Sequence, residues 1–174
     1  MADPSSPQGV RFDGQVAIVT GAGRGLGAAY ARLLAGRGAA VVVHDAGVAA
    51  DGSGFDPAVA DTVTREIMSR GGTAVACHDN LESAAGCRRV IEFAFERFER
   101  IDVLVHNAGL VIFTSIEETD PTTRDRMVNL GIHGCASPKP HPTQLTTAAA
   151  FATGQGALGD SRQEGRPAGA SGHH

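Results

Sequence analysis

Three glycines, Gly21, Gly25 and Gly27, follow a short apolar run and open a helical pattern in the stretch VAIVTGAGRGLGAAYARLLA. Glycine at such a turn lets the backbone approach a pyrophosphate closely, which a Cβ atom would block. Free N–H groups at the start of the helix then receive the negative charge. A tight strand-to-helix turn also uses glycine, and the spacing departs from G-x-G-x-x-G because Leu26 replaces its third glycine. The glycines alone therefore leave a nucleotide site and a plain turn equally open.

Asp45 ends the second apolar run, 24 residues after Gly21. A carboxylate at this place accepts the ribose hydroxyls of NAD and repels the 2′-phosphate of NADP. An aspartate in a loop or at a helix start is also common. Arg24 points the other way, because a guanidinium in the glycine turn could pair with a 2′-phosphate. We expect NAD rather than NADP, since Asp45 would have to be neutralised before NADP could bind.

The alternation of apolar runs and helical patterns predicts the elements that position these residues. Unbroken apolar runs of this kind suit strands that are buried on both faces of a parallel sheet. Strands that alternate with helices imply right-handed βαβ crossovers, and hence an α/β fold. The predicted strands are Val16–Thr20, Ala40–His44, Thr73–Cys77 and Asp102–His106, and the predicted helices are Leu26–Arg37, Pro57–Arg70, Ser83–Arg100 and Pro121–Gly134.

Two further stretches fall at the carboxyl edge of this sheet, where open α/β sheets bind their ligands. One is the glycine-rich loop Gly47–Phe55, which follows the second strand. The other is HNAG, His106–Gly109, which ends the fourth strand. Asn and Gly at a strand end are turn residues by default. Their position at the edge that carries Gly21 and Asp45 makes a cofactor contact plausible.

Composition narrows the function classes. The 174 residues carry a net charge of −4 and no basic run, which argues against nucleic acid or an anionic membrane as the main partner. No apolar stretch approaches the length that spans a bilayer, and residues 1–11 read as a flexible leader. The three cysteines, Cys77, Cys87 and Cys135, give no metal or disulfide framework. We expect free thiols in a reducing cytoplasm, and no metal.

The character of the chain changes at about Cys135. Residues 135–174 hold only three large apolar side chains, and CASPKPHPTQ has three prolines at alternate positions. Such a segment has too little apolar surface to offset the entropy of ordering it. We therefore expect residues 135–174 to be a low-complexity, mostly disordered tail with at most one short helix near Thr146–Thr153. The composition also resembles an out-of-frame reading of GC-rich DNA.

Together these motifs resemble the short-chain dehydrogenase/reductase family. The resemblance rests on TGAGRGLG at Thr20–Gly27, on Asp45 and Asp79, on NAG at Asn107–Gly109 and on VNLGIHG at Val128–Gly134. The run VVVHDAG with the glycine-rich insert is similar to the NAD-using hydroxyacyl-CoA dehydrogenase-like branch. The resemblance covers residues 12–134, while the last 40 residues do not match. It implies a Rossmann-type dinucleotide-binding fold and hydride transfer between a secondary alcohol and a ketone, usually in a homo-oligomer.

The resemblance also implies a role for each matching position. Gly21, Gly25, Leu26 and Gly27 would carry the pyrophosphate. Asp45 would hold the adenosine ribose, and Asp79 with Asn80 would contact the adenine. Asn107, Ala108 and Gly109 would line the cofactor. Asn129 matches the asparagine that holds a water in the family's proton relay, although a polar residue near a helix end is the plainer interpretation.

The residues that complete the family's chemistry are missing from their usual places. The family uses a serine after the fifth strand and a Y-x-x-x-K pair, whose lysine lowers the pKa of the tyrosine. The only tyrosine here is Tyr30, on the first helix, and the only lysine is Lys139, among prolines with Ser137. A full sheet of this kind runs 3-2-1-4-5-6, but only 3-2-1-4 can be read, which would leave the fourth strand as an apolar edge.

We therefore expect a truncated, inactive cofactor-binding part that needs the missing half to bind a small-molecule substrate. The alternatives are an enzyme with a partner chain or an untypical acid/base, and a non-catalytic nucleotide-binding or interaction module.

Overall fold

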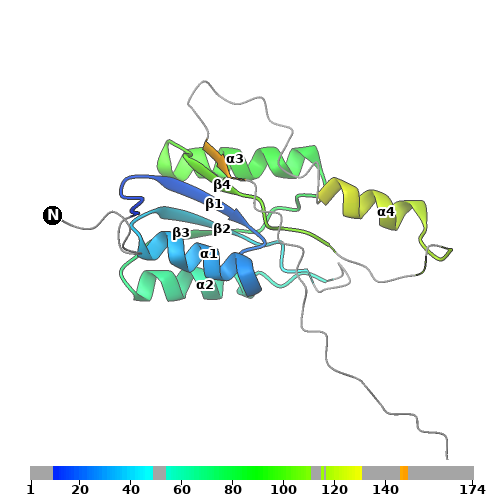
Figure 1. Ribbon diagram of the computed structural model, residues 1–174, viewed down its shortest axis with the longest axis horizontal. Helices are drawn as coiled ribbons and strands as arrows, with labels where there is room; N and C mark the ends of the chain where they lie inside the picture. The colour runs from blue at the N-terminus through cyan, green and yellow to red at the C-terminus, as the bar shows by residue number, and fades with distance from the viewer. Residues whose placement is uncertain (1–9, 49–53, 111–114, 116, 131–145, 149–174) are drawn as a thin grey trace, which may run out of the picture.

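The computed structural model describes residues 10–48, 54–110, 115, 117–130 and 146–148, and it shows a parallel sheet between two layers of helices (Figure 1). The sheet order is β3-β2-β1-β4-β5, so the predicted order 3-2-1-4 is confirmed. The strands are β1 (Val16–Thr20), β2 (Ala40–His44), β3 (Thr73–Cys77), β4 (Val103–Val105) and β5 (Thr146–Ala148). The helices are α1 (Gly25–Gly36), α2 (Ala58–Ser69), α3 (Ala84–Phe98) and α4 (Pro121–Val128).

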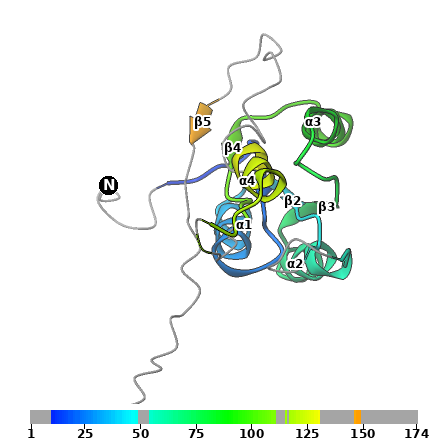
Figure 2. The same cartoon turned by 90° about the vertical axis from the view of Figure 1, so that its right-hand side faces the viewer.

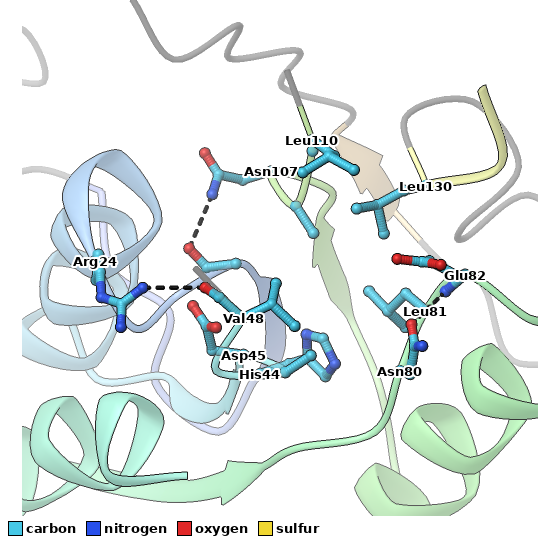
Figure 3. A pocket seen from close by; sticks show the side chains of 14 residues that line it. Arg24, His44, Asp45, Val48, Asn80, Leu81, Glu82, Asn107, Leu110 and Leu130 are labelled. Atoms are coloured by element: carbon cyan, nitrogen blue, oxygen red, sulfur yellow. Dashed lines mark hydrogen bonds between the residues drawn. The ribbon is translucent and has the colours of Figure 1, made fainter. Parts of the chain in front are cut away.

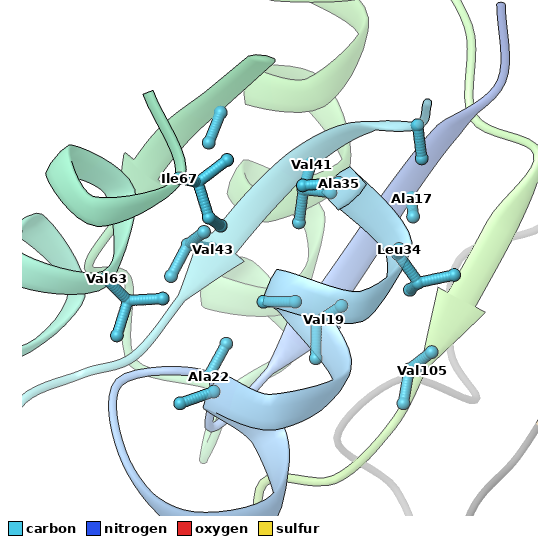
Figure 4. Close-up of a cluster of buried hydrophobic side chains, with 14 of the residues drawn as sticks. Ala17, Val19, Ala22, Leu34, Ala35, Val41, Val43, Val63, Ile67 and Val105 are labelled. Carbon is cyan, nitrogen blue, oxygen red and sulfur yellow. The ribbon is translucent and has the colours of Figure 1, made fainter. Parts of the chain in front are cut away.

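The hydrophobic core divides into two clusters, one on each face of the sheet. Alternate residues of a strand point to opposite faces, so Val19 packs toward α1 and α2 while Ile18 packs toward α3. Figure 4 shows the first cluster, in which Leu34 of α1 and Ile67 of α2 close over the valines of β1 and β2. Burial on both faces explains why these strands read as unbroken apolar runs.

Capping side chains fix the first residues of α3 and α4. The Ser83 hydroxyl oxygen accepts the N–H of Gly86 at 3.1 Å, which caps the start of α3. The Asp120 carboxylate accepts the N–H of Thr123 at 3.0 Å, and Pro121 takes the first position of α4. Figures 1 and 2 place α4 beyond the carboxyl ends of the strands rather than against a face of the sheet.

The prediction that the fourth strand forms the edge of the sheet is wrong. Residues Thr146–Ala148 form β5, which pairs in parallel with β4 and places Val103 opposite Thr146. The sequence allowed at most a short helix near Thr146–Thr153, and the first three of these residues form a strand instead. An apolar strand with unpaired N–H and C=O groups is a template for another strand, and this edge accounts for the pairing. The remainder of the predicted tail, and residues 1–9 of the predicted leader, lie outside the described residues.

None of the helices in the described part of the chain is long and apolar enough to cross a membrane.

Candidate functional site

A cavity of about 270 Å³ lies at the carboxyl ends of β1, β2 and β4 (Figure 3). Typical ligand pockets measure roughly 300–1,000 Å³, so the volume of this cavity lies just below that range. Seven residues that the sequence predicted as site residues line it, namely Gly21, Arg24, Asp45, Asn80, Asn107, Ala108 and Gly109. The fold therefore brings the glycine turn, the acidic strand end and the NAG stretch to one place.

The glycine turn is locked to the NAG stretch by hydrogen bonds. The Asn107 side-chain N–H group donates to the carbonyl oxygens of Thr20 and Gly21, both at 3.1 Å. Gly21 has a φ of +62°, and a Cβ atom on it would lie 2.9 Å from Cα of Ala108. Only glycine combines this conformation with such a close approach. Asn107 thus fixes the turn that would face a pyrophosphate.

Thr20 joins this edge of the sheet to α4 through a histidine. Its buried Oγ1 accepts the backbone N–H groups of Asn107 at 3.1 Å and Ala108 at 3.0 Å. Its own hydroxyl hydrogen is left for Nδ1 of His106, 3.3 Å away. Nε2 of that histidine therefore carries the hydrogen and donates to the carbonyl oxygen of Leu130 at 3.1 Å. Thr20 was not predicted as a site residue, because in the sequence its hydroxyl is only the first position of the TGAGRGLG motif.

Replacing Thr20 tests this network. Thr20→Val keeps the shape of the side chain but leaves two backbone N–H groups without an acceptor, so we expect a loss of about 2 kcal/mol in the free energy of unfolding. Thr20→Ser keeps the hydroxyl and removes one methyl group, which costs about 1 kcal/mol. Urea denaturation of both variants measures the difference. Equal stability of the two variants would contradict the acceptor role of Thr20.

Asp45 lies half-buried at the end of β2 with both carboxylate oxygens held by backbone groups. Gly23 donates its N–H to one oxygen at 2.9 Å, and Gly47 donates to the other at 2.8 Å. A Cβ atom on Gly23 would lie 2.2 Å from Cγ1 of Val59 and 2.8 Å from the Asp45 carboxylate. Gly23 is therefore a residue that the sequence argument missed, although its place inside the glycine turn was a signal.

Among the predicted cofactor residues, Arg24 lines the cavity, while four others lie outside its lining. Arg24 precedes α1, is exposed, and donates to the carbonyl oxygen of Val48 at 3.2 Å. Gly25 and Leu26 are exposed and Gly27 is buried in the first turn of α1, outside the lining of the cavity. Asp79 does not line the cavity either, because its carboxylate is turned to Arg89 of α3 at 2.5 Å.

The chain just after α4 reaches the cavity through Leu130, the residue next to the predicted Asn129. Asn129 follows the last residue of α4 and is exposed, whereas Leu130 lines the cavity. Arg126 of α4 forms an ion pair at 2.8 Å with Glu82, another lining residue. These contacts anchor the end of α4 beside the site, and they leave Asn129 away from the lining.

Among the described residues, Tyr30 is the candidate for the family's acid–base chemistry, and it does not line the cavity. Tyr30 is half-buried on α1 and packs against the cluster that α1 and α2 share. Lys139 and Ser137 lie outside the described residues. Within the described ranges, no group of three His, Cys, Asp or Glu side chains is placed to hold a metal ion.

His44 is a buried titratable group at the same edge. Its Nε2 lies 2.7 Å from the carbonyl oxygen of Asp79, and burial lowers the pKa of the imidazole below its usual value. The folded chain therefore holds His44 neutral, while the unfolded chain takes up a proton below about pH 6.5. The unfolded state then binds more protons, so the stability that neutral His44 contributes is lost as the pH falls below that value.

A pH series checks this expectation. We expect the free energy of unfolding to fall between about pH 7 and pH 5.5, more steeply than in His44→Phe, which has no proton to take up. Urea denaturation at both pH values gives the two slopes. Parallel slopes in the two proteins would show that His44 is not the group responsible.

Seven lining residues were missed, of which five adjoin a predicted residue while Val48 and Glu82 lie two or three positions from one. They are His44, Ala46, Val48, Leu81, Glu82, Leu110 and Leu130. The sequence argument selected polar and glycine residues, while apolar residues form the walls of most ligand pockets. Adjacency to Asp45, Asn80, Gly109 and Asn129 was the signal that could have found those five.

Comparison with known proteins agrees with this geometry. The family model described as short chain dehydrogenase matches residues 15–139. A peroxisomal hydratase-dehydrogenase-epimerase of Neurospora crassa is 45% identical over 114 residues, which are 64% of this chain and 12% of that protein.

Two solved structures share the fold. The structure of 7α-hydroxysteroid dehydrogenase with NADH and 7-oxo glycochenodeoxycholic acid matches with 30% identity and a TM-score of 0.65, over 74% of this chain and 47% of that one. A metagenomic short-chain oxidoreductase in complex with NADP matches with 32% identity and a TM-score of 0.63, over 71% and 52%. This chain thus spans about half or less of the proteins that it matches. Because the family model covers residues 15–139, well over half of its length, the chain belongs to the short chain dehydrogenase family.

Proposed function

We propose that the chain binds NAD(H) in the cavity at the carboxyl ends of β1, β2 and β4, as the cofactor-binding part of an oxidoreductase for secondary alcohols and ketones. Asp45 carries this proposal. Gly23 and Gly47 hold both of its carboxylate oxygens at the cavity by N–H donation at 2.9 and 2.8 Å. A carboxylate oxygen accepts more than one hydrogen bond, so each oxygen retains capacity for a ribose hydroxyl.

The remaining residues fit the other parts of a dinucleotide. Helix α1 begins at Gly25, so the backbone N–H groups of Gly25, Leu26 and Gly27 have no acceptor within the helix. Such groups bind an anion such as a pyrophosphate favourably. Asn107, Ala108 and Gly109 line the side of the cavity formed by the end of β4. A bound nicotinamide would supply the hydride chemistry, and this chain's own residues would bind and orient it.

Binding of the two dinucleotides tests the proposal. We expect NADH to bind at least about tenfold more tightly than NADPH, because the Asp45 carboxylate repels a 2′-phosphate. Asp45→Asn keeps an acceptor oxygen without the charge, and should narrow the ratio to about threefold or less. Titration followed by nicotinamide fluorescence gives both dissociation constants.

Asp13→Asn is the matched control for net charge. Asp13 precedes β1 at the opposite end of the sheet, where it pairs with Arg11. The control should keep the preference of the unmutated chain. Equal affinity of the unmutated chain for NADH and NADPH would contradict the role of Asp45.

The proposal extends to the organisation of the chain. Residues 12–134 form the cofactor-binding domain, and residues 135–174 add the edge strand β5 to its sheet but no catalytic group. Asn129 matches the proton-relay position only, since the chain has no serine and no Y-x-x-x-K pair at the family's positions. The Neurospora relative is named as a peroxisomal enzyme. The cytoplasmic location inferred from the sequence therefore stays a prediction.

A further inference from the structure

His44 presents an unused hydrogen-bond acceptor in the lining of the cavity. The residue ends β2 beside Asp45, and its side chain lies between Asp45 and the turn at Asn80 and Leu81 (Figure 3). Nε2 is 2.7 Å from the carbonyl oxygen of Asp79. A carbonyl oxygen only accepts, so Nε2 must carry the hydrogen. Nδ1 of the neutral ring is then a lone-pair acceptor.

This acceptor has no partner among the described residues. His44 is 1% exposed, and Nδ1 is one of two buried side-chain atoms in the described ranges without a hydrogen bond. A buried acceptor without a donor is unfavourable, and most such groups in proteins are satisfied. A ligand that brings an N–H group to Nδ1 would remove this cost.

Asp79, the residue that the family resemblance assigns to the base, is engaged elsewhere. Its carboxylate pairs with Nε of Arg89 at 2.5 Å, and Sγ of Cys77 lies 3.7 Å from its second oxygen. It is also absent from the lining of the cavity, whereas His44 is part of it. The residue with an acceptor that lines the cavity at this strand end is therefore His44 rather than Asp79.

We propose that Nδ1 of His44, and not the Asp79 carboxylate, accepts a hydrogen bond from the exocyclic amino group of adenine, so that His44 selects adenine over a 6-oxo purine. This inference rests on the proposed function. If Asp45 holds the adenosine ribose, the base attached to that ribose lies next to Asp45 at the ends of β2 and β3. The amino group of adenine presents an N–H donor there, while the 6-oxo group of hypoxanthine only accepts and so cannot form a hydrogen bond with the lone pair of Nδ1.

Access to Nδ1 requires a local movement. Figure 3 shows Val48 and Leu81 on either side of the imidazole, and both line the cavity. Because His44 is buried in the free chain, the base reaches Nδ1 when one of these side chains changes rotamer. Side-chain changes of this size are common when partners bind.

The test compares NADH with reduced nicotinamide hypoxanthine dinucleotide, which differs at the base. We expect the unmutated chain to bind NADH about tenfold more tightly, His44→Phe to bind the two within about threefold, and Asp79→Asn to keep the tenfold ratio. A ratio near one in the unmutated chain, or a ratio lost in Asp79→Asn and kept in His44→Phe, would overturn the assignment. If neither dinucleotide binds, the proposed function itself fails.

A second measurement needs no variant and so does not depend on the folding of His44→Phe. In the chain labelled with ¹⁵N-histidine, NADH should shift the Nδ1 resonance of His44 as a hydrogen bond forms, and the hypoxanthine analogue should not. Saturation with NADH that leaves this resonance unmoved would refute the proposal.

Discussion

We expect the purified 174-residue chain to bind NADH but to oxidise no secondary alcohol and reduce no ketone or hydroxyacyl thioester above the uncatalysed rate. Hydride transfer to a ketone also needs a proton delivered to the developing alkoxide. Such acid–base assistance contributes about 10²–10⁴ in rate. The only tyrosine, Tyr30, packs against the cluster beside α1 and α2 and does not line the cavity. Absorbance of NADH over a substrate panel measures the turnover.

Two variants distinguish an untypical activity of this chain from the activity of a contaminating enzyme. Tyr30→Phe and Asn129→Ala remove the tyrosine and the residue at the proton-relay position. If the unmutated chain turns over a substrate and Asn129→Ala abolishes that turnover, the expectation of an inactive chain is wrong. Activity that both variants retain in full would point to another enzyme in the preparation.

The coding DNA gives an independent check on the same expectation. If residues 135–174 are an out-of-frame product, one of the other two frames near codon 134 should encode an apolar helix, a serine-ended strand and a Y-x-x-x-K pair. A gene with no such reading in either frame would remove the frameshift explanation, though not the expected lack of turnover.

The sequence predicted the first three strands to the residue and the first three helices to within two residues at each end. Helix α4 ends at Val128 instead of the predicted Gly134, and residues 131–134 lie outside the described part of the chain. The signal of the strands is strong because strands buried on both faces carry unbroken apolar runs.

The fourth strand, Val103–Val105, is one residue shorter than predicted at each end, although the backbone N–H of Asp102 still donates to the carbonyl oxygen of Val16 at 2.9 Å. The side chains of the two flanking residues also form hydrogen bonds. Asp102 accepts the N–H of Val16 at 2.8 Å, and His106 bridges Thr20 and Leu130. β5 could not be predicted, because Thr146–Ala148 carries no apolar run and its pairing depends on the open edge of β4.

Site residues could be predicted where the sheet topology sets their position. They were harder to predict where the position depends on which partner a side chain contacts. Gly21, Asp45 and Asn107 follow from the topology, since the carboxyl ends of parallel strands share one edge. The direction of Asp79 depends on Arg89, ten residues later on α3, and no local pattern encodes that pairing. His44 was read as a strand-end residue, although its burial beside Asp45 places it in the cavity.

Gly27→Ala should have the largest effect of any single methyl group added to α1. Its Cβ atom would lie 2.1 Å from the Gly21 carbonyl oxygen and 2.6 Å from Nδ2 of Asn107. The first is a backbone atom and the second holds that carbonyl, so neither can move without opening the turn. Overpacking lowers the free energy of unfolding by about 1–3 kcal/mol, and the lost hydrogen bond lowers it by about 1 kcal/mol. The higher helix propensity of alanine raises it by up to about 1 kcal/mol.

The expected result for Gly27→Ala is a loss of about 2 kcal/mol in the free energy of unfolding together with at least tenfold weaker binding of NADH. Gly36→Ala in the same helix is the matched control, because beyond its chain neighbours and the backbone of its own helix no described atom lies within 4 Å of its added Cβ, and its φ needs no glycine. The control should bind NADH unchanged and be as stable as the unmutated chain or up to about 1 kcal/mol more stable. Urea denaturation and fluorescence titration report the two effects separately. If Gly27→Ala matched Gly36→Ala in both, the contact between the first turn of α1 and the Gly21 carbonyl would not be what shapes the nucleotide site.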